Sequence, residues 1–172
     1  MATLRAAVAD DLQGILDIYN HAIEHTTAIF EYRPHTLDKR REWFKAKGAA
    51  GLPVVVAIED DRVIGFASYG PFRAWPAYKY TVEHSVYVDV NCRGRGVGRA
   101  LVNEMIAEAR RRDMHAVIAG ITTDNLPSLH LHRTLGFVEV AHFREVGYKF
   151  GHWLDLTFLQ LLLDTPSRPT EP

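Results

Sequence analysis

The feature that most constrains this chain is the segment Arg93-Gly94-Arg95-Gly96-Val97-Gly98, set between a strand-like run and a helix-like run. Its glycines expose backbone N–H groups, and its arginines, with Arg99, add positive charge. A helix that begins at such a loop directs its first-turn amides and the positive end of its dipole to the same place. The segment therefore predicts a strand–loop–helix unit that binds a phosphorylated ligand.

The spacing of this segment excludes two familiar phosphate-binding loops. The loop of nucleotide triphosphatases ends in Gly-Lys-Ser/Thr, whereas Gly98 is followed by Arg99. A dinucleotide fingerprint needs glycine at its first, third and sixth positions, and the sixth position counted from Gly94 is Arg99. What remains is the spacing Arg-x-x-Gly-x-Gly, formed by Arg93, Gly96 and Gly98. An ordinary strand–helix turn stays open as the alternative for this motif alone.

Composition narrows the classes of protein that remain. With 172 residues and 47% apolar side chains, the chain has the size and apolar content of one globular domain. A formal net charge of -1 gives no general argument for binding nucleic acid or an anionic membrane. The one cysteine, Cys92, precludes an internal disulfide and is typical of a reducing compartment. Since neither a signal-peptide pattern nor a membrane-spanning apolar run is present, we expect a cytoplasmic protein.

Strand and helix signals alternate along the chain. Apolar periodicity predicts helices at residues 10–25, 36–47, 98–112 and from 125 or 128 to 135, the first two capped by Asp10 and Thr36. Strands are predicted at 3–8, 53–59, 62–69, 81–90, 115–121, 137–146 and 153–163, with a hairpin turn at Asp60-Asp61. We therefore expect one α/β domain with a mixed sheet over residues 1–164, followed by a loose tail at 165–172.

The strand expected at 81–90 leads directly into the glycine–arginine segment. Its alternation places one face toward the core, with Val82, Val86, Val88 and Val90. The opposite face carries Glu83, Ser85, Tyr87 and Asp89. Glu83 is therefore a candidate for proton transfer, and its alternative is a carboxylate held in an ion pair.

A third segment lies downstream, where Asn125-Leu126-Pro127-Ser128 is followed by a short helix and Leu135-Gly136-Phe137. Together with the strand and the loop, it resembles the GNAT family of acetyl-coenzyme A-dependent N-acetyltransferases. The resemblance implies a three-layer α/β (α+β) fold, with a central mixed, mostly antiparallel twisted sheet of six to seven strands flanked by about four helices. It also implies acetyl-coenzyme A as co-substrate, without a metal.

The resemblance also assigns the residues that hold acetyl-coenzyme A. The loop would bind the pyrophosphate through Arg93, Gly94, Arg95, Gly96, Val97, Gly98 and Arg99. The backbone of Val86, Tyr87 and Val88 would bond to the pantetheine amides and supply an oxyanion donor, although these valines are equally well explained as core. Asn125 and Ser128 would bond to the cofactor, and helix capping is their alternative.

Further segments resemble a narrower subgroup, the phosphinothricin and methionine sulfoximine/methionine sulfone acetyltransferases. They are Tyr80 to Val88, Val146 to Leu156, and the stretch from Tyr19-Asn20 to Glu31. The resemblance implies a homodimer that acetylates the α-amino group of small amino-acid analogues by direct attack. Glu83 would be the base, and His132, which stands where many family members have tyrosine, would give a proton to the departing thiolate. A histidine that is merely packed is the alternative for His132.

The acceptor amine is expected to meet a separate set of side chains. Arg73 can pair with the carboxylate of an amino acid, and aromatic walls can pack its side chain. The predicted substrate-binding residues are Phe30, Glu31, Arg73, Trp75, Tyr78, Glu83 and Ser85. Loop aromatics that only cover the core are the alternative.

Other functions remain open at this stage. His21-Ala22-Ile23-Glu24-His25 matches the His-x-x-Glu-His form of a zinc protease, but a third ligand is not evident, so no metal is predicted. Rival activities are acetylation of a protein N-terminus or of an antibiotic amine. A rival of another class is a non-catalytic module that senses coenzyme A.

Overall fold

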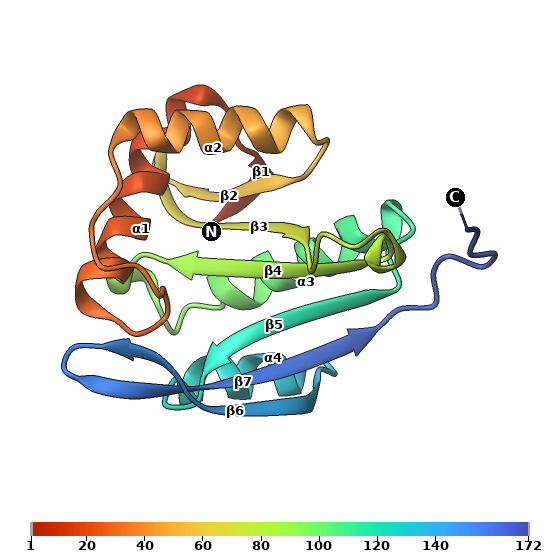
Figure 1. Ribbon diagram of the computed structural model, residues 1–172. Helices are drawn as coiled ribbons and strands as arrows, with labels where there is room; N and C mark the ends of the chain where they lie inside the picture. Colours follow the sequence, from red (N-terminus) through yellow and green to blue (C-terminus); the bar gives the residue numbers. More distant parts are fainter. Residues whose placement is uncertain (1, 172) are drawn as a thin grey trace. The chain divides into compact units, whose positions relative to one another are not determined.

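Seven strands form one open sheet in the computed structural model, which describes residues 2–171 (Figure 1). The strand order is β1-β2-β3-β4-β5-β7-β6. The strands are β1 Thr3–Ala6, β2 Val54–Glu59, β3 Arg62–Pro71, β4 Thr81–Val88, β5 Ala116–Thr122, β6 Val138–Lys149 and β7 His152–Leu162. The α-helices of the described residues are α1 Leu12–His25, α2 Leu37–Ala49, α3 Val97–Arg111 and α4 Leu126–Thr134. The predicted α/β fold, with a mixed sheet of six to seven strands, is confirmed.

The sheet is mixed. β4 runs parallel to β5, and this register pairs Thr81–Glu83 with Ala116–Ile118. The pairs β1/β2, β2/β3, β5/β7 and β6/β7 are antiparallel. A parallel pair needs a crossover connection, which is provided here by the loop after β4 and by α3. The glycine–arginine segment therefore lies within the crossover.

The chain divides into two compact units, which are described separately. The first contains residues up to 68 together with 85–104, and its core joins one face of α1 to β2 and β3. The buried residues of this core are Leu12, Ile15, Ile18, Val54, Val56, Val63 and Phe66. The hairpin turn between β2 and β3 lies at Asp60 and Asp61 as predicted, with φ of 50° and 57°.

The two predicted helix caps have different outcomes. The Thr36 side chain accepts a hydrogen bond from the Lys39 N–H at 3.2 Å, so this cap is confirmed. The Asp10 cap is wrong, because a 3-10 turn over Ala9–Asp11 precedes α1. The Asp11 carboxylate instead accepts from the Arg5 guanidinium at 2.7 and 2.8 Å and from the Val8 N–H at 2.7 Å. The hydrogen bond from Arg5 holds the pKa of Asp11 below its usual range.

The second unit contains residues 69–84 and 105 onward, and β6 and β7 form its long hairpin (Figure 1). The residues after β7 make side-chain contacts within this unit. The Thr165 hydroxyl donates to the Met114 carbonyl, and the Tyr80 hydroxyl accepts from the Thr170 N–H at 3.0 Å. The division into a domain at 1–164 and a tail stays a prediction.

The end of β4 differs from the predicted strand at 81–90. The strand ends at Val88, and the next residues form a 3-10 turn over Val90–Cys92. The Asp89 side chain accepts a hydrogen bond from the Asn91 N–H at 2.8 Å, which turns the chain at this point. Val90 is consequently 45% exposed rather than part of the core. This turn leads the chain into the glycine–arginine segment.

Candidate active site

The glycine–arginine segment forms a tight loop before α3. Gly94 and Gly96 adopt left-handed backbone conformations, with φ of 73° and 83°. Residues with a β-carbon adopt this conformation at a cost, so glycine is the natural choice at both positions. A β-carbon built at either glycine meets nothing within 4 Å, so the backbone is open to an approaching ligand. The first N–H groups of α3 lack carbonyl partners within the helix and are available as donors at the end of this loop.

The arginines of the loop are not equivalent. Arg95 Nη2 donates to both carboxylate oxygens of Glu59 at 2.7 Å, and this pairing lowers the pKa of Glu59. Arg93 is exposed and makes no ion pair within residues 2–171. A bound phosphate would therefore meet Arg93 directly, whereas Arg95 would have to share its charge with Glu59.

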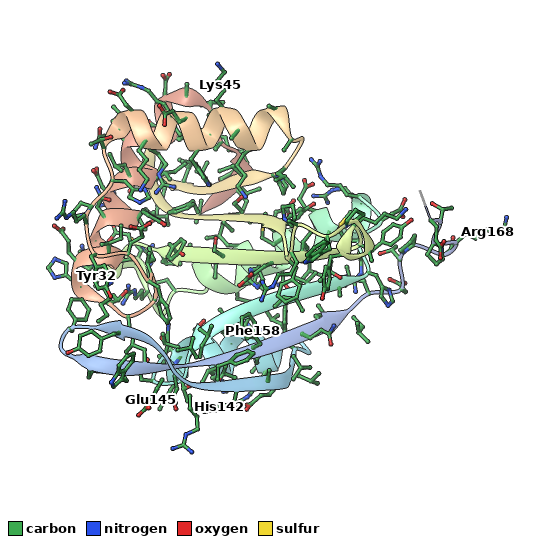
Figure 2. The ribbon with its side chains drawn as sticks, viewed as in Figure 1. Tyr32, Lys45, His142, Glu145, Phe158 and Arg168 are labelled. Carbon is green, nitrogen blue, oxygen red and sulfur yellow. The ribbon has the colours of Figure 1, made fainter. Side chains whose placement is uncertain are left out.

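Glu83 lies half-buried on β4. Burial raises the pKa of its carboxyl group, and the positive charge of Arg73 acts in the opposite direction. On β5, a β-carbon at Gly120 would lie 3.0 Å from the carboxylate Oε1 and 3.2 Å from the ring of Phe158. Gly120 thus leaves the space that the carboxylate occupies beside β7, where Phe158 is labelled in Figure 2. The arrangement yields a carboxylate of increased basicity with one cation nearby.

The loop between β3 and β4 holds the predicted substrate residues of the second unit. Arg73 Nη1 donates to the Phe72 carbonyl at 2.8 Å, and the guanidinium lies 4.1 Å from the centre of the Phe72 ring. Tyr78 packs edge-on against the same ring, with centroids 5.7 Å apart. Trp75 is 74% exposed. The loop therefore brings Arg73 and Tyr78 to one aromatic side chain.

The predicted substrate residues of the first unit lie after α1. Phe30 is 44% exposed, and Glu31 lies 3.8 Å from His35 Nε2 and 4.0 Å from Lys39 Nζ. Tyr32, which follows them, is labelled in Figure 2. Glu31 is thus already close to a cation of α2.

Two predicted cofactor residues are joined at the start of α4. The Asn125 side chain caps the helix by accepting from the Ser128 N–H at 3.3 Å. The helix ends at Thr134, and Gly136 shortly after it has a φ of 90°. The capping role that was an alternative for Asn125 is therefore present, and it leaves the Asn125 side-chain amide N–H groups available as donors.

His132 is buried and hydrogen-bonded at both ring nitrogens. Its Nδ1 lies 2.7 Å from the Ser128 carbonyl oxygen and 3.5 Å from the Ser128 hydroxyl. Its Nε2 lies 3.1 Å from His84 Nε2. Only 1% of the His132 surface is exposed. Burial lowers its pKa, so the ring is neutral near pH 7.

His84 is the residue of this region that sequence reasoning missed. It is 7% exposed and occupies the buried face of β4 beside Val82. The alternation that placed Val82 inside also places His84 inside, so its burial was readable from the sequence. Its partner was not, because His132 lies 48 residues further along the chain.

The described residues show neither a metal site nor a membrane span. The His21 and His25 rings lie 4.6 Å apart, but no group of three or more potential metal ligands occurs in residues 2–171. Over the same residues, no helix combines the length and apolarity needed to cross a bilayer.

The chain is similar to known proteins over most of its length. Residues 15–137 match the model of the Acetyltransferase (GNAT) family. The chain is 46% identical to an L-methionine sulfoximine/L-methionine sulfone acetyltransferase of Salmonella typhimurium, over 97% of this chain and 98% of the relative. It is 36% identical to a phosphinothricin N-acetyltransferase of Streptomyces coelicolor, over 91% and 94% of the two chains.

A solved structure is also similar over nearly the whole chain. A protein of Salmonella typhimurium, solved with its cofactor acetyl-CoA, superposes with a TM-score of 0.95 at 45% identity, covering 99% of this chain and 98% of that one. The family match extends over more than half of the chain, and the relatives cover nearly all of it. This protein therefore belongs to the GNAT family of acetyltransferases.

Proposed function

We propose that this protein transfers the acetyl group of acetyl-coenzyme A to the α-amino group of a small amino-acid analogue. Methionine sulfoximine, methionine sulfone and phosphinothricin are the acceptors to test first, because relatives at 46% and 36% identity carry these names. The observation that supports the residue assignment best is Glu83, a half-buried carboxylate of raised pKa with Arg73 as its nearby cation. The Glu83 carboxylate can take a proton from an amine, and the Arg73 guanidinium can hold the carboxylate of an amino acid.

Glu83 is the proposed general base. An α-amine arrives mainly as ammonium and must lose a proton before its nitrogen attacks the thioester carbonyl. Burial raises the pKa of Glu83, which makes its carboxylate a stronger proton acceptor. The proton passes to Glu83 directly or through one water, and the nitrogen then forms the new C–N bond. Attack is direct, so no acetyl-enzyme forms.

Acetyl-coenzyme A is proposed to bind along the strand–loop–helix unit. Arg93, Arg99 and the amides around Gly94 and Gly96 would hold its pyrophosphate. The parallel ladder with β5 pairs β4 residues Thr81–Glu83, so the backbone of Val86–Val88 lies outside that ladder. These backbone groups would bond to the pantetheine amides, and one N–H would stabilise the oxyanion.

The departing thiolate is proposed to meet α4. The Ser128 hydroxyl is the group that can contact the sulfur, since His132 is enclosed behind it. His132 would act by hydrogen bonding to Ser128, so the proton that finally reaches sulfur comes from the amine by way of solvent. Each turnover removes two protons from the ammonium, and the balance is kept because the thiolate gains one proton and solvent receives the other.

Release of free thiol from acetyl-coenzyme A tests the proposed function. The purified protein is given a panel of amines: the three amino-acid analogues, a protein N-terminal peptide and an aminoglycoside. We expect release above hydrolysis with the amino-acid analogues alone. Preference for the peptide or the aminoglycoside would support the rival acetyltransferases, and the failure of every amine to give release above hydrolysis would support a coenzyme A-sensing module.

Replacement of Arg73 with alanine is expected to raise the KM for methionine sulfone by roughly tenfold or more, because a charge-assisted hydrogen bond to its carboxylate is lost. For 3-(methylsulfonyl)propan-1-amine, which lacks that carboxylate, KM should change less than about twofold. The matched control is R168A, which removes an exposed arginine after β7 (Figure 2). Equal losses with both amines would show that Arg73 does not recognise the carboxylate.

A homodimer is proposed through the hairpin of β6 and β7. The outer part of this hairpin exposes several large apolar side chains, and the Tyr148 and Trp153 rings are 5.1 Å apart. Exposed members include Val146, Tyr148, Phe150 and Trp153, at 47–59%. Contiguous exposed apolar surface commonly marks an interface.

A cytoplasmic location is also proposed, because the single cysteine of the sequence is typical of a reducing compartment.

The substitution W153E should convert the dimer to a monomer, since a charge would be buried in the contact. Light scattering after size exclusion, at several protein concentrations, measures the mass. W75E is the matched control, because Trp75 is an exposed tryptophan of another segment, and it should leave the mass unchanged. A wild-type protein that is monomeric throughout this range would refute the dimer.

A further inference from the structure

Two histidines from distant parts of the chain meet in the interior of the second unit. His84 on β4 and His132 on α4 approach with their Nε2 atoms 3.1 Å apart, and their rings are tilted by 36°. Phe137 packs against both rings, with centroid distances of 5.7 and 5.1 Å. Both side chains are more than nine-tenths buried. A hydrogen bond between the two Nε2 atoms needs one donor and one acceptor, so only one of these atoms carries a proton.

The contacts fix the position of every ring proton. A carbonyl oxygen can only accept, so His132 Nδ1, 2.7 Å from the Ser128 carbonyl, carries a proton. Nε2 of a neutral His132 is then an acceptor, and the hydrogen atom in the contact between the rings belongs to His84 Nε2. His84 Nδ1 therefore carries a lone pair, and this buried atom has no hydrogen-bond partner among the described residues.

The pair stays neutral. Burial, together with the nearby His132, lowers the pKa of His84 to about 3. A second proton on His132 would be placed on Nε2, directly facing the His84 Nε2 proton. The pair therefore holds one arrangement of its protons at physiological pH.

The histidine pair connects the two elements that carry the proposed chemistry. His84 follows Glu83 directly on β4, with its side chain on the opposite face of the strand. His132 lies one turn after Ser128 on α4, and its Nδ1 bonds to the carbonyl of that residue. The contact thus joins the strand of the proposed base to the first turn of the helix that carries Asn125 and Ser128.

We propose that His84 is a positioning residue: by donating its Nε2 proton to His132, whose tautomer the Ser128 carbonyl sets, it ties α4 to β4 and fixes the first turn of α4 for coenzyme A. A purely apolar side chain would fill the same space without leaving Nδ1 unpaired, which disfavours packing as the sole role of His84. The proposal rests on the proposed function only for its link to coenzyme A.

The test compares three variants. His84→Gln keeps an N–H donor that can reach His132, His84→Leu keeps a similar bulk without a donor, and His84→Asn keeps a donor on a shorter side chain. Long-range proton–nitrogen NMR spectra report the tautomer of His132, and calorimetry measures the Kd of coenzyme A. Neither readout requires turnover, so both remain informative if the proposed acetyl transfer is wrong.

We expect His132 to be the Nδ1–H tautomer in the wild type and in H84Q. In H84L and H84N, the nitrogen signal of His132 Nε2 should shift because its hydrogen bond is lost, and the Kd of coenzyme A should rise about tenfold. H84Q should restore most of the affinity. H84N provides the comparison should H84L fail to fold. The proposal is overturned if wild-type His132 is the Nε2–H tautomer or charged at pH 7, or if the variants without a reaching donor keep the wild-type affinity for coenzyme A.

Discussion

Replacing Glu83 with glutamine is expected to lower kcat by about two to four orders of magnitude, the range that general acid–base catalysis contributes. Glutamine has nearly the same size, so it fits the half-buried space beside Gly120, but its amide cannot take a proton from the ammonium. The KM for acetyl-coenzyme A should change little, because Glu83 is not among the residues proposed to hold the cofactor. Steady-state kinetics with methionine sulfone measures both constants.

The pH profile gives an independent measure of the same role. A base must be deprotonated, and burial raises the pKa of Glu83 above its ordinary value. The acid limb of kcat/KM should therefore lie at a higher pH than an exposed glutamate would give. Since the positive charge of Arg73 lowers this pKa, the R73A variant should move the limb to still higher pH.

A matched control separates this effect from a general loss of charge. E139Q removes an exposed carboxylate on β6 that pairs with Arg133 at 3.0 Å, and it should leave kcat within about twofold. Unchanged turnover in E83Q would show that another group or water is the base.

The substitution of Gly96 by alanine should raise the KM for acetyl-coenzyme A and leave kcat nearly unchanged, which is the opposite of the pattern expected for E83Q. Alanine pays about 1–2 kcal/mol to adopt the left-handed backbone that Gly96 has at φ of 83°. The loop would relax and turn its amides away from the pyrophosphate, so the KM for acetyl-coenzyme A should rise roughly tenfold. At saturating cofactor, kcat should remain close to that of the wild type.

Gly51 supplies the control for this substitution. It has a similar left-handed conformation, with φ of 65°, after the end of α2. G51A should therefore lower the melting temperature as G96A does, without changing the KM. A normal KM in G96A would show that the loop amides do not bind the cofactor.

Much of this fold is readable from the sequence because its signals are local. The β2–β3 hairpin follows from two runs of apolar residues around Asp60-Asp61, and the loop follows from glycines placed where a strand ends and a helix begins. The exceptions depend on side chains nearby in space. Asp11 rather than Asp10 shapes the start of α1 because Arg5 and the Val8 amide reach it.

The limits of sequence reasoning in the site have the same physical cause. Glu83 was predicted as a base from its strand position, but the space at Gly120 that accommodates it comes from β5. Arg95 was grouped with the other loop arginines, and its partner Glu59 lies 36 residues earlier. The pairing of His132 with His84 likewise arises only when α4 is placed beside β4. Residue types and spacing indicate chemistry, whereas partners come from the tertiary fold.

The turn that ends β4 has a practical consequence for measuring the reaction. Cys92 closes that turn and is only 2% exposed, with its Sγ 3.6 Å from Arg62 Nη2. It is the single thiol of the sequence. A colorimetric thiol reagent added during turnover should therefore react with released coenzyme A and leave the native protein unlabelled. The same reagent under denaturing conditions should report one thiol per chain, which turns this cysteine into an internal standard for the fraction of folded enzyme.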